Sequence, residues 1–307
     1  MDSIDVLNFG SLNIDHVYQV PHFVRPKETL SCTEYARFAG GKGLNQSVAL
    51  ARAGVRVAHA GKIGADGEFL EETLRTAGVD TRFLIRGPEA TGHAIIQVDR
   101  EGQNCILFYP GANQTLTREE ILGILGQVKP GTILLLQNEI NEIPFLLEEG
   151  KRRGLICAIN PAPCGPEVSD YPLELADLLF VNEVEGAELS GGVTAPAKIL
   201  DILTVRYPDT EIILTLGGDG ACRGKGPDRF HVASPAVPVV DTTSAGDTFT
   251  GYYLAARLRG CSPERAMETA ALAGSLAVSR AGAAASIPEA DEVFPPEHGQ
   301  NTVDTPR

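Results

Sequence analysis

The sequence lacks the features that would direct a protein to a membrane or to an anionic polymer. Acidic residues outnumber basic residues by 40 to 26, which gives a formal charge of −14 over 307 residues. No apolar run approaches the roughly 18–20 residues of a membrane span, and the first ten residues carry no cationic signal segment. A chain this acidic binds nucleic acids and anionic membranes poorly through bulk charge. We therefore expect no nucleic-acid partner, no membrane partner and a cytoplasmic location.

Metal-binding, disulfide and common nucleotide-binding patterns are also missing. The six cysteines form no CxxC pair, and no histidine lies at metal-ligand spacing from any of them. Cys157 and Cys222 lie in apolar runs, which is typical of free thiols in a reducing compartment. The sequence has no Walker A loop and no protein-kinase loop with an HRD partner. The first strand is followed by GSLNID rather than GxGxxG, which argues against an NAD-binding Rossmann enzyme.

What the sequence does contain is an alternation of short apolar runs and amphipathic segments. The runs that we predict to be strands are 6–9, 55–60, 132–137, 155–160, 178–182 and 212–216. Helix-period segments lie near 43–53, 67–77, 117–126, 142–153 and 195–206, and alanine-rich helices follow at 247–259 and 263–280. This order predicts an α/β domain over residues 1–294, with a mainly parallel sheet covered on both faces. Residues 295–307 are polar and proline-rich, so we expect a flexible tail there.

Two pairs of segments depart from this alternation of strands and helices. Residues 14–20 and 30–38 alternate polar and apolar side chains, and so do residues 93–99 and 104–109. Such alternation is typical of hairpin strands with one partly solvated face. The four segments predict either a small β-layer that projects from the main domain or edge strands of the main sheet.

The loop before Asp247 is the most informative stretch. Small residues Ser244, Ala245 and Gly246 lead directly into a helix whose first turn contains Asp247. A helix start offers unpaired N–H donors to a phosphoryl group, and a carboxylate there can accept a proton from a hydroxyl. This combination suits phosphoryl transfer. By itself the loop is equally compatible with Asp247 acting only as a helix cap.

Two segments near the N-terminus have the chemistry of a carbohydrate site. Asn13 and Asp15 follow the first strand and face the same way on an extended chain, so they offer both donors and acceptors to a polyhydroxy ligand. The stretch Gly40-Gly41-Lys42-Gly43-Leu44-Asn45-Gln46 opens a helix, and its glycines allow a ligand to approach the backbone closely. Taken separately, each segment is also compatible with an ordinary turn.

Together these segments resemble the ribokinase family of sugar kinases (PfkB-type), from the first strand to about Pro288. Both signatures of that family are present, at residues 40–46 and 240–248. The resemblance implies a central, mainly parallel sheet flanked by helices. It also implies a small β-sheet lid, near residues 14–38 and 93–109, that often makes a homodimer.

The resemblance also implies roles for individual residues. Asp247 would be the catalytic base, and the N–H groups of Ala245 and Gly246 would form the anion hole. The residues that would bind the sugar are Asn13, Asp15, Gly41, Lys42, Gly43, Asn45 and Glu139. Those that would bind ATP are Asn182, Thr215, Leu216, Gly217, Gly218, Asp219, Gly220 and Gly246. Glu185 would hold Mg²⁺ through water, and an activating K⁺ would bind at Asp241, Thr243, Ala277, Arg280, Gly282 and Ser286.

The substrate implied by the resemblance is a small sugar, with ribose favoured by Asn13, Asp15 and the GGKGLNQ form of the loop. Deoxyribose, fructose or another sugar stays an alternative, as does a catalytically silent sugar-binding regulator with the same fold. Two positions depart from the family pattern: Ser244 stands where glycine is frequent, and Asn138 precedes Glu139 where leucine is more familiar. Asn138 therefore leaves the choice of sugar open.

Overall fold

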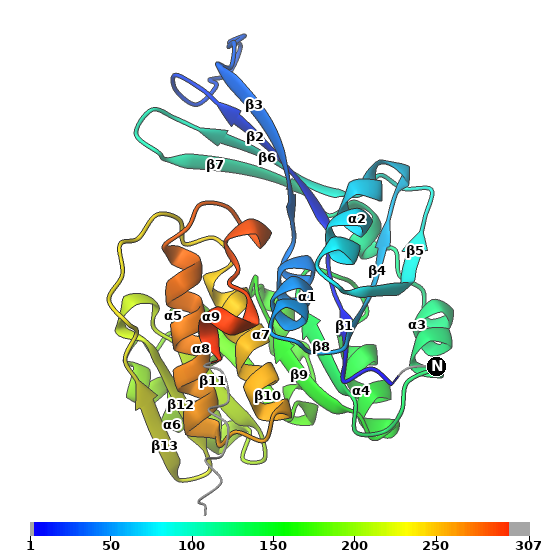
Figure 1. Cartoon of the computed structure of the whole chain (residues 1–307), viewed down its shortest axis with the longest axis vertical. Coiled ribbons are helices and arrows are strands. Elements are labelled where there is room, and N and C mark those ends of the chain that lie inside the picture. Colours follow the sequence, from blue (N-terminus) through cyan, green and yellow to red (C-terminus); the bar gives the residue numbers. More distant parts are fainter. Residues whose placement is uncertain (1–2, 295–307) are drawn as a thin grey trace, which may run out of the picture.

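The main body is a nine-stranded sheet with helices on both faces (Figure 1). The structure, a computed structural model, describes residues 3–294. The strand order is β13-β12-β11-β10-β9-β8-β1-β4-β5. All neighbours from β11 to β5 are parallel, while β12 and β13 are antiparallel additions at one edge. In sequence order the strands are β1 (Val6–Phe9), β4 (Val57–Ile63), β5 (Asp80–Arg86), β8 (Ile133–Gln137), β9 (Ile156–Asn160), β10 (Leu178–Asn182), β11 (Glu211–Thr215), β12 (Ala221–Lys225) and β13 (Asp228–Val232).

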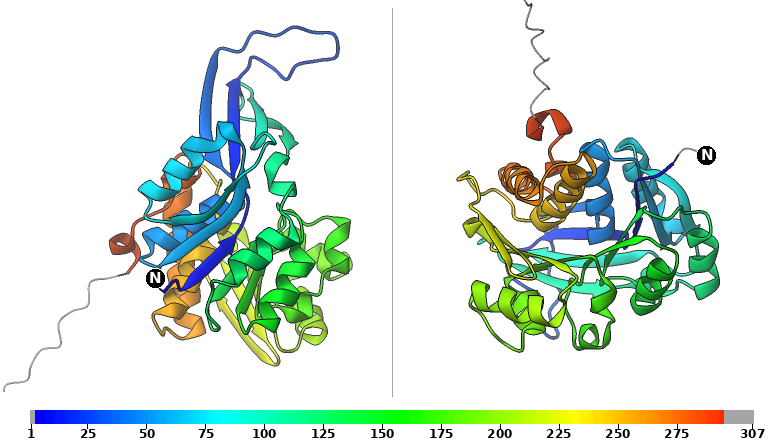
Figure 2. Two further views of the ribbon diagram at one scale, coloured as in Figure 1. Left: turned by 90° about the vertical axis from the view of Figure 1, so that its right-hand side faces the viewer. Right: turned by 90° about the horizontal axis from the view of Figure 1, so that it is seen from below.

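Successive residues of the central strands are buried against opposite helix layers. Val6 and Leu135 belong to the apolar cluster that also contains residues of α1, α2, α7 and α8. Leu7 and Leu134 belong to the second cluster, which contains residues of α3, α4, α5 and α6. The view from below shows the sheet between the two layers (Figure 2). The helices are α1 (Lys42–Arg52), α2 (Glu68–Thr76), α3 (Arg118–Leu125), α4 (Ile143–Arg152), α5 (Glu183–Leu189), α6 (Pro196–Arg206), α7 (Ala245–Leu258), α8 (Pro263–Val278) and α9 (Ala290–Val293).

A separate four-stranded sheet projects from the body as a lid (Figures 1 and 2). Its strands are β2 (Asn13–Gln19), β3 (Glu34–Gly40), β6 (Gly92–Val98) and β7 (Asn104–Tyr109), in the order β3-β2-β6-β7. The strands form two antiparallel hairpins that pair in parallel through β2 and β6. The alternating segments of the sequence therefore form a projecting β-layer and are not edge strands of the main sheet.

The predicted fold class is confirmed, and most element positions agree with it. The sequence reading did not identify β5, β12 and β13. β5 and β13 are the two edge strands and β12 lies next to β13, and exposed positions on these strands permit charged residues such as Arg82, Lys225 and Asp228. The expected tail at 295–307 lies outside the described residues. Within residues 3–294, no helix combines the length and apolar character needed to cross a membrane.

Candidate active site

A cleft of about 2110 Å³ lies between the lid and the carboxyl ends of the parallel strands. Side chains of β2, β3, β6 and β7 line it on the lid side, and the residues that end β9, β10 and β11 line it from below. Ligands of open α/β sheets bind at this edge. The volume exceeds what a monosaccharide would fill, so the cleft has room for a second, larger ligand.

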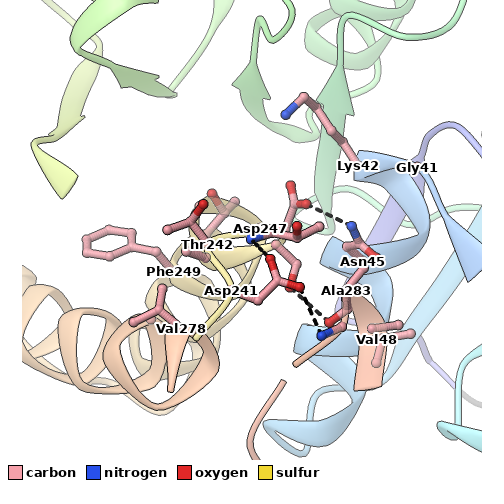
Figure 3. A pocket seen from close by; sticks show the side chains of 18 of the residues that line it. Gly41, Lys42, Asn45, Val48, Asp241, Thr242, Asp247, Phe249, Val278 and Ala283 are labelled. Carbon is pink, nitrogen blue, oxygen red and sulfur yellow. Dashed lines mark hydrogen bonds between the residues drawn. The ribbon is translucent and has the colours of Figure 1, made fainter. Parts of the chain in front are cut away.

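Asp247 is buried in the first turn of α7, at the floor of this cleft (Figure 3). Its Oδ2 accepts a hydrogen bond from Asn45 Nδ2 at 3.1 Å, and its Oδ1 accepts one from Gln46 Nε2 at 2.9 Å. Burial raises the pKa of Asp247, and Lys42, Gln46 and Asn45 oppose this rise in part. The result is a desolvated carboxylate with one donor on each oxygen.

Ser244 lies before α7 in the left-handed conformation, with φ of 62°. Glycine adopts this conformation at no steric cost, which explains why glycine is frequent at this position in the family pattern. Here the Ser244 hydroxyl donates to Ala283 O at 2.9 Å and lies 3.3 Å from Ser286 Oγ. The serine therefore ties the start of α7 to the loop after α8.

The two residues expected to form an anion hole differ in their surroundings. Ala245 N–H donates to Thr242 O at 3.3 Å, so this amide already has an acceptor. Both residues line the cleft, and a Cβ added at Gly246 would meet no other atom within 4 Å. The open space beside Gly246 leaves room for a ligand against the start of α7.

The lid end of the cleft contains the residues expected at a sugar. Asn13, Asp15, Gly41, Lys42, Asn45 and Glu139 all line it. Glu139 Oε2 accepts hydrogen bonds from the Ser11 hydroxyl and from Lys42 N–H, the latter at 3.0 Å. Asn45 Oδ1 is buried and has no partner among the described residues, so it has an acceptor position available for a ligand hydroxyl. Burial, assisted by the charge of Glu139, raises the pKa of Asp15 to about 6.

Gly43 was expected to bind the sugar, but it does not line the cleft. A Cβ there would lie 2.4 Å from Ser11 N and 2.5 Å from Gly10 C, so this glycine lets α1 pack against the end of β1. Its carbonyl accepts a hydrogen bond from Asn8 Nδ2 at 2.8 Å.

Lys42 is the cation at the centre of this group of carboxylates. Burial alone would lower its pKa, but the charges of Asp247, Glu139 and Glu185 raise that pKa overall. Lys42 therefore stays protonated and balances part of the negative charge that these three acids would otherwise concentrate in the cleft.

The opposite end of the cleft contains most of the residues expected at a nucleotide. Asn182, Thr215, Gly217, Gly218 and Gly220 line it. Leu216 and Asp219 were expected there too, but neither lines the cleft, and Leu216 is buried in the core. The sequence reading missed the loop 234–239 and the face of α8 that line this end, because neither carries a motif.

The two segments expected to hold a monovalent cation are joined by the Asp241 side chain and by backbone hydrogen bonds from Val240 and Asp241 to Val278 O. Asp241 accepts hydrogen bonds from Thr243 N–H at 2.9 Å and from Gly282 N–H at 3.0 Å. The Ser286 hydroxyl donates to Ala283 O, and the guanidinium of Arg280 pairs with Glu292. Backbone N–H groups already donate to Ala277 O. The two loops thus converge beside the start of α7 (Figure 3).

Comparison with known proteins agrees with this geometry. Residues 3–290 match the pfkB family of carbohydrate kinases. The chain belongs to that family. A ribokinase from Staphylococcus aureus is 35% identical over 302 residues, which are 94% of this chain and 98% of that protein. A deoxyribokinase from Salmonella typhi is 29% identical, with 94% of this chain and 97% of that protein covered.

Solved structures of ribokinases have the same fold. That of Cryptococcus neoformans, in complex with ADP, has a TM-score of 0.84 and 33% identity and covers 95% of this chain and 99% of its own. That of Arabidopsis thaliana, complexed with ribose and ATP, has a TM-score of 0.84 and 28% identity and covers 95% and 98%. The chain is thus a carbohydrate kinase of the ribokinase family, a phosphotransferase.

Several residues that build the site were missed by the sequence reading. Asn113 Nδ2 donates to Asn13 Oδ1 at 2.8 Å, and its Oδ1 accepts from Leu12 N–H at 3.0 Å, so it orients the Asn13 amide. In the same way, the Ser11 hydroxyl donates to Glu139 and orients that carboxylate, and Gln46 donates to Asp247. Gln46 is the last residue of the family signature at 40–46. Asn113, by contrast, lies 100 residues from Asn13, and no sequence pattern connects the two.

Asn138, one of the two departures from the family pattern, hydrogen-bonds residues of the segment 163–171 beside the cleft. Its Nδ2 donates to Pro163 O at 2.7 Å and to Glu167 Oε1 at 2.9 Å, and its Oδ1 accepts from the Tyr171 hydroxyl at 2.7 Å. Its amide atoms are therefore engaged within the protein, which removes the reason to connect Asn138 with the choice of sugar.

Proposed function

We propose that this chain transfers the γ-phosphoryl group of ATP to the 5-hydroxyl of D-ribose, with Asp247 as the general base. The observation that carries the proposal is the position of Asp247. It lies in the first turn of α7, between the polar lid end of the cleft and the glycine-rich end, where an attacking hydroxyl and a phosphoryl group would meet. The ribokinases among the relatives and the ribose in the Arabidopsis complex support ribose as the acceptor.

In this proposal the lid end binds the sugar and the other end binds ATP. Asn13, Asp15, Asn45 and Glu139 hydrogen-bond the hydroxyls, and Gly41 and Lys42 border them. The N–H of Gly246, with that of Ala245 at its side, stabilises charge that develops on the transferred group. Asn182 and the turn from Thr215 to Gly220 hold the nucleotide.

The residues fit Mg²⁺ that arrives bound to ATP. Among residues 3–294, no three His, Cys, Asp or Glu side chains group closely enough to hold a metal ion. Both oxygens of Glu185 accept hydrogen bonds from Asn182, at 2.9 Å each, and burial raises the pKa of Glu185. A carboxylate held in this way suits a contact to the ion through water. Bound Mg²⁺ would neutralise charge on the phosphates.

The loops at 241–243 and 277–286, which the Asp241 side chain joins, fit a weakly hydrated monovalent cation. Backbone carbonyls of Asp241, Thr243, Ala277, Arg280 and Gly282, with the Ser286 hydroxyl, are the oxygens proposed to surround K⁺. Arg280 can contribute only its carbonyl oxygen, because a guanidinium is a cation with no acceptor atom, and here it pairs with Glu292.

We expect potassium to activate the enzyme and sodium to do so poorly. The Asp241–Thr243 loop continues directly into Ser244 and the start of α7. A cation there would order the N–H donors before ATP binds and so raise turnover. Rates at one ionic strength in potassium, caesium, sodium and tetramethylammonium salts test this. Equal turnover in all four salts would remove the cation site from the account.

We also propose that the lid forms a homodimer. The lid face that points away from the cleft exposes Tyr35, Ile95, Leu107 and Tyr109, while Phe38, Ile106 and Phe108 belong to the face that lines the cleft. Leu107→Glu should therefore convert a dimer to a monomer in light scattering, because a buried unpaired carboxylate opposes association. A monomeric native protein would contradict the proposal.

We propose a cytoplasmic location as well. All six cysteines are free thiols, which suits a reducing compartment such as the cytoplasm.

A coupled assay of ADP formation over a panel of sugars tests the proposed substrate. We expect kcat/KM to be highest for ribose and lower for deoxyribose, fructose and nucleosides. The match to a deoxyribokinase makes deoxyribose the second candidate, and a higher kcat/KM for deoxyribose would select it. Sugar binding without ADP formation would indicate a silent regulator.

A further inference from the structure

A chain of buried amides runs from the backbone of α1 to Asp247. Asn8, Gln46 and Gln137 form this chain, and all three side chains have 0% exposure. Gln137 Nε2 donates to Asn8 Oδ1 at 3.0 Å and to Gln46 Oε1 at 2.7 Å. Gln46 Nε2 then donates to Asp247 Oδ1 at 2.9 Å. The sugar and ATP roles proposed above use none of these three residues.

The direction of every amide in this chain follows from one backbone carbonyl. Gly43 O can only accept, so the amide nitrogen of Asn8 must face it, at 2.8 Å, and Asn8 Oδ1 must face Gln137. Gln137 therefore presents its nitrogen to Asn8 and Gln46, and Gln46 must turn its own nitrogen toward Asp247. Gln137 Oε1 is left buried without a partner among the described residues, which is the cost of this arrangement.

Neighbouring amides on α1 thus contact Asp247 in different ways. Asn45 donates to Oδ2 and keeps an unpartnered Oδ1 that is available to a sugar hydroxyl. Gln46 has both amide atoms engaged within the protein, so its donor cannot turn away from Asp247 when a ligand binds.

We infer that Gln46 is a positioning residue that holds Asp247 Oδ1 and keeps the base ionised, with its orientation set by the chain Gly43–Asn8–Gln137. This inference rests on the proposed role of Asp247. An N–H donor stabilises the charged form of a buried carboxylate. Fixing Oδ1 leaves Oδ2 as the oxygen that faces the reacting hydroxyl beside Asn45.

The other charged groups around Asp247 do not touch Gln46. Lys42 from α1, Glu139 after β8 and Glu185 from α5 are the charges that act on the site. Besides its bonds to Asp247 and Gln137, the Gln46 side chain donates a long hydrogen bond from Nε2 to Asn160 Oδ1, at 3.4 Å. A change at Gln46 therefore acts on the titration of Asp247 before that of the other acids.

The test is the pH dependence of kcat for ribose and ATP in Gln46→Met, which keeps the length of the side chain and removes its donor. We expect the acid limb to move up by about one to two pH units, the effect of losing one hydrogen bond to an ionised carboxylate. The KM for ribose should stay within about threefold of the native value, since Gln46 does not line the cleft. An acid limb that stays in place overturns the inference.

Two further variants keep the result unambiguous. Gln46→Glu sets a second carboxylate against Asp247, and the pair will hold a proton to higher pH, so its acid limb should move further than that of Gln46→Met. If Gln46→Met does not fold, the position of the acid limb in Gln46→Glu tests the inference in its place. Ser47→Ala is the matched control: Ser47 follows Gln46 on α1, accepts a hydrogen bond from Asn8 Nδ2 and contacts His59 Nδ1, each at 2.8 Å, but its hydroxyl bonds neither Gln46 nor Asp247, and Gly43 O still fixes the Asn8 amide in the variant. It should lose thermal stability and keep the native acid limb.

The outcomes separate this inference from the proposed function. An equal shift of the acid limb in Ser47→Ala would reduce Gln46 to a structural residue and overturn the inference. The native enzyme could be active and Asp247→Asn inactive while the acid limb of kcat in Gln46→Met stays at its native pH. That result would overturn only the role of Gln46. A native chain that forms no ADP with any sugar would overturn the proposed function itself.

Discussion

Asp247→Asn is expected to reduce turnover by about 10²–10⁴-fold or more, the loss associated with removal of a general base. An amide cannot accept the proton of the attacking hydroxyl. The fold should survive, because Asn and Asp have the same shape. Gln46 will still donate to the oxygen of the new amide, and Asn45 can turn its unpartnered Oδ1 toward the new nitrogen.

Single-turnover kinetics, with ribose binding measured separately by calorimetry, will check this expectation. The melting temperature of Asp247→Asn should equal or exceed that of the native protein, since the variant buries no charge. Near-normal turnover in this folded variant would return Asp247 to the role of a helix cap.

Asp15→Ala and Asn45→Ala are expected to raise the apparent KM for ribose by about ten- to hundredfold and to change the KM for ATP little. Each substitution removes a hydrogen-bond partner of a sugar hydroxyl in a desolvated site, an effect of about 1–3 kcal/mol. Both side chains line the lid end of the cleft, away from the turn at Thr215–Gly220. Steady-state kinetics with each substrate varied in turn will measure the split.

Asn138→Leu is the matched control for these two variants. Asn138 lines the same cleft, but its amide bonds Pro163, Glu167 and Tyr171. Its KM for ribose should therefore stay close to the native value. Equal increases of the two KM values in Asp15→Ala would show that the sugar pocket has been assigned to the wrong end of the cleft.

The central sheet and the lid could be predicted because each has its own periodicity. Buried parallel strands such as Leu178–Asn182 are continuous apolar runs, whereas the lid strands alternate because only one of their faces lines the cleft: in Gly92–Val98, Ala94 and Ile96 line it and His93 and Gln97 do not. The strands Ala221–Lys225 and Asp228–Val232, the second of which forms one edge of the sheet, are short and carry charged residues such as Lys225 and Asp228 at exposed positions, so neither pattern marks them.

The residues of the cleft could be predicted where they have a local sequence signal, and less so where their role is to contact another side chain. Asn13 and Asp15 follow a strand, and Asp247 follows a loop of small residues, so each has a local signal. Asn113 acts on Asn13 across 100 residues, and space for that contact exists because position 92 is glycine: a Cβ there would lie 2.1 Å from Asn113 Nδ2. Such contacts depend on the folded arrangement of distant elements.

The most direct test of the account is the structure of the product formed from ribose and ATP. Phosphorus–proton correlation by NMR identifies the sugar carbon that carries the new phosphate. The account predicts that the phosphorus couples to the two protons of the primary carbon, as in ribose 5-phosphate, and that ADP forms in equal amount. Coupling to the anomeric proton, or ADP formed without a sugar phosphate, would contradict it.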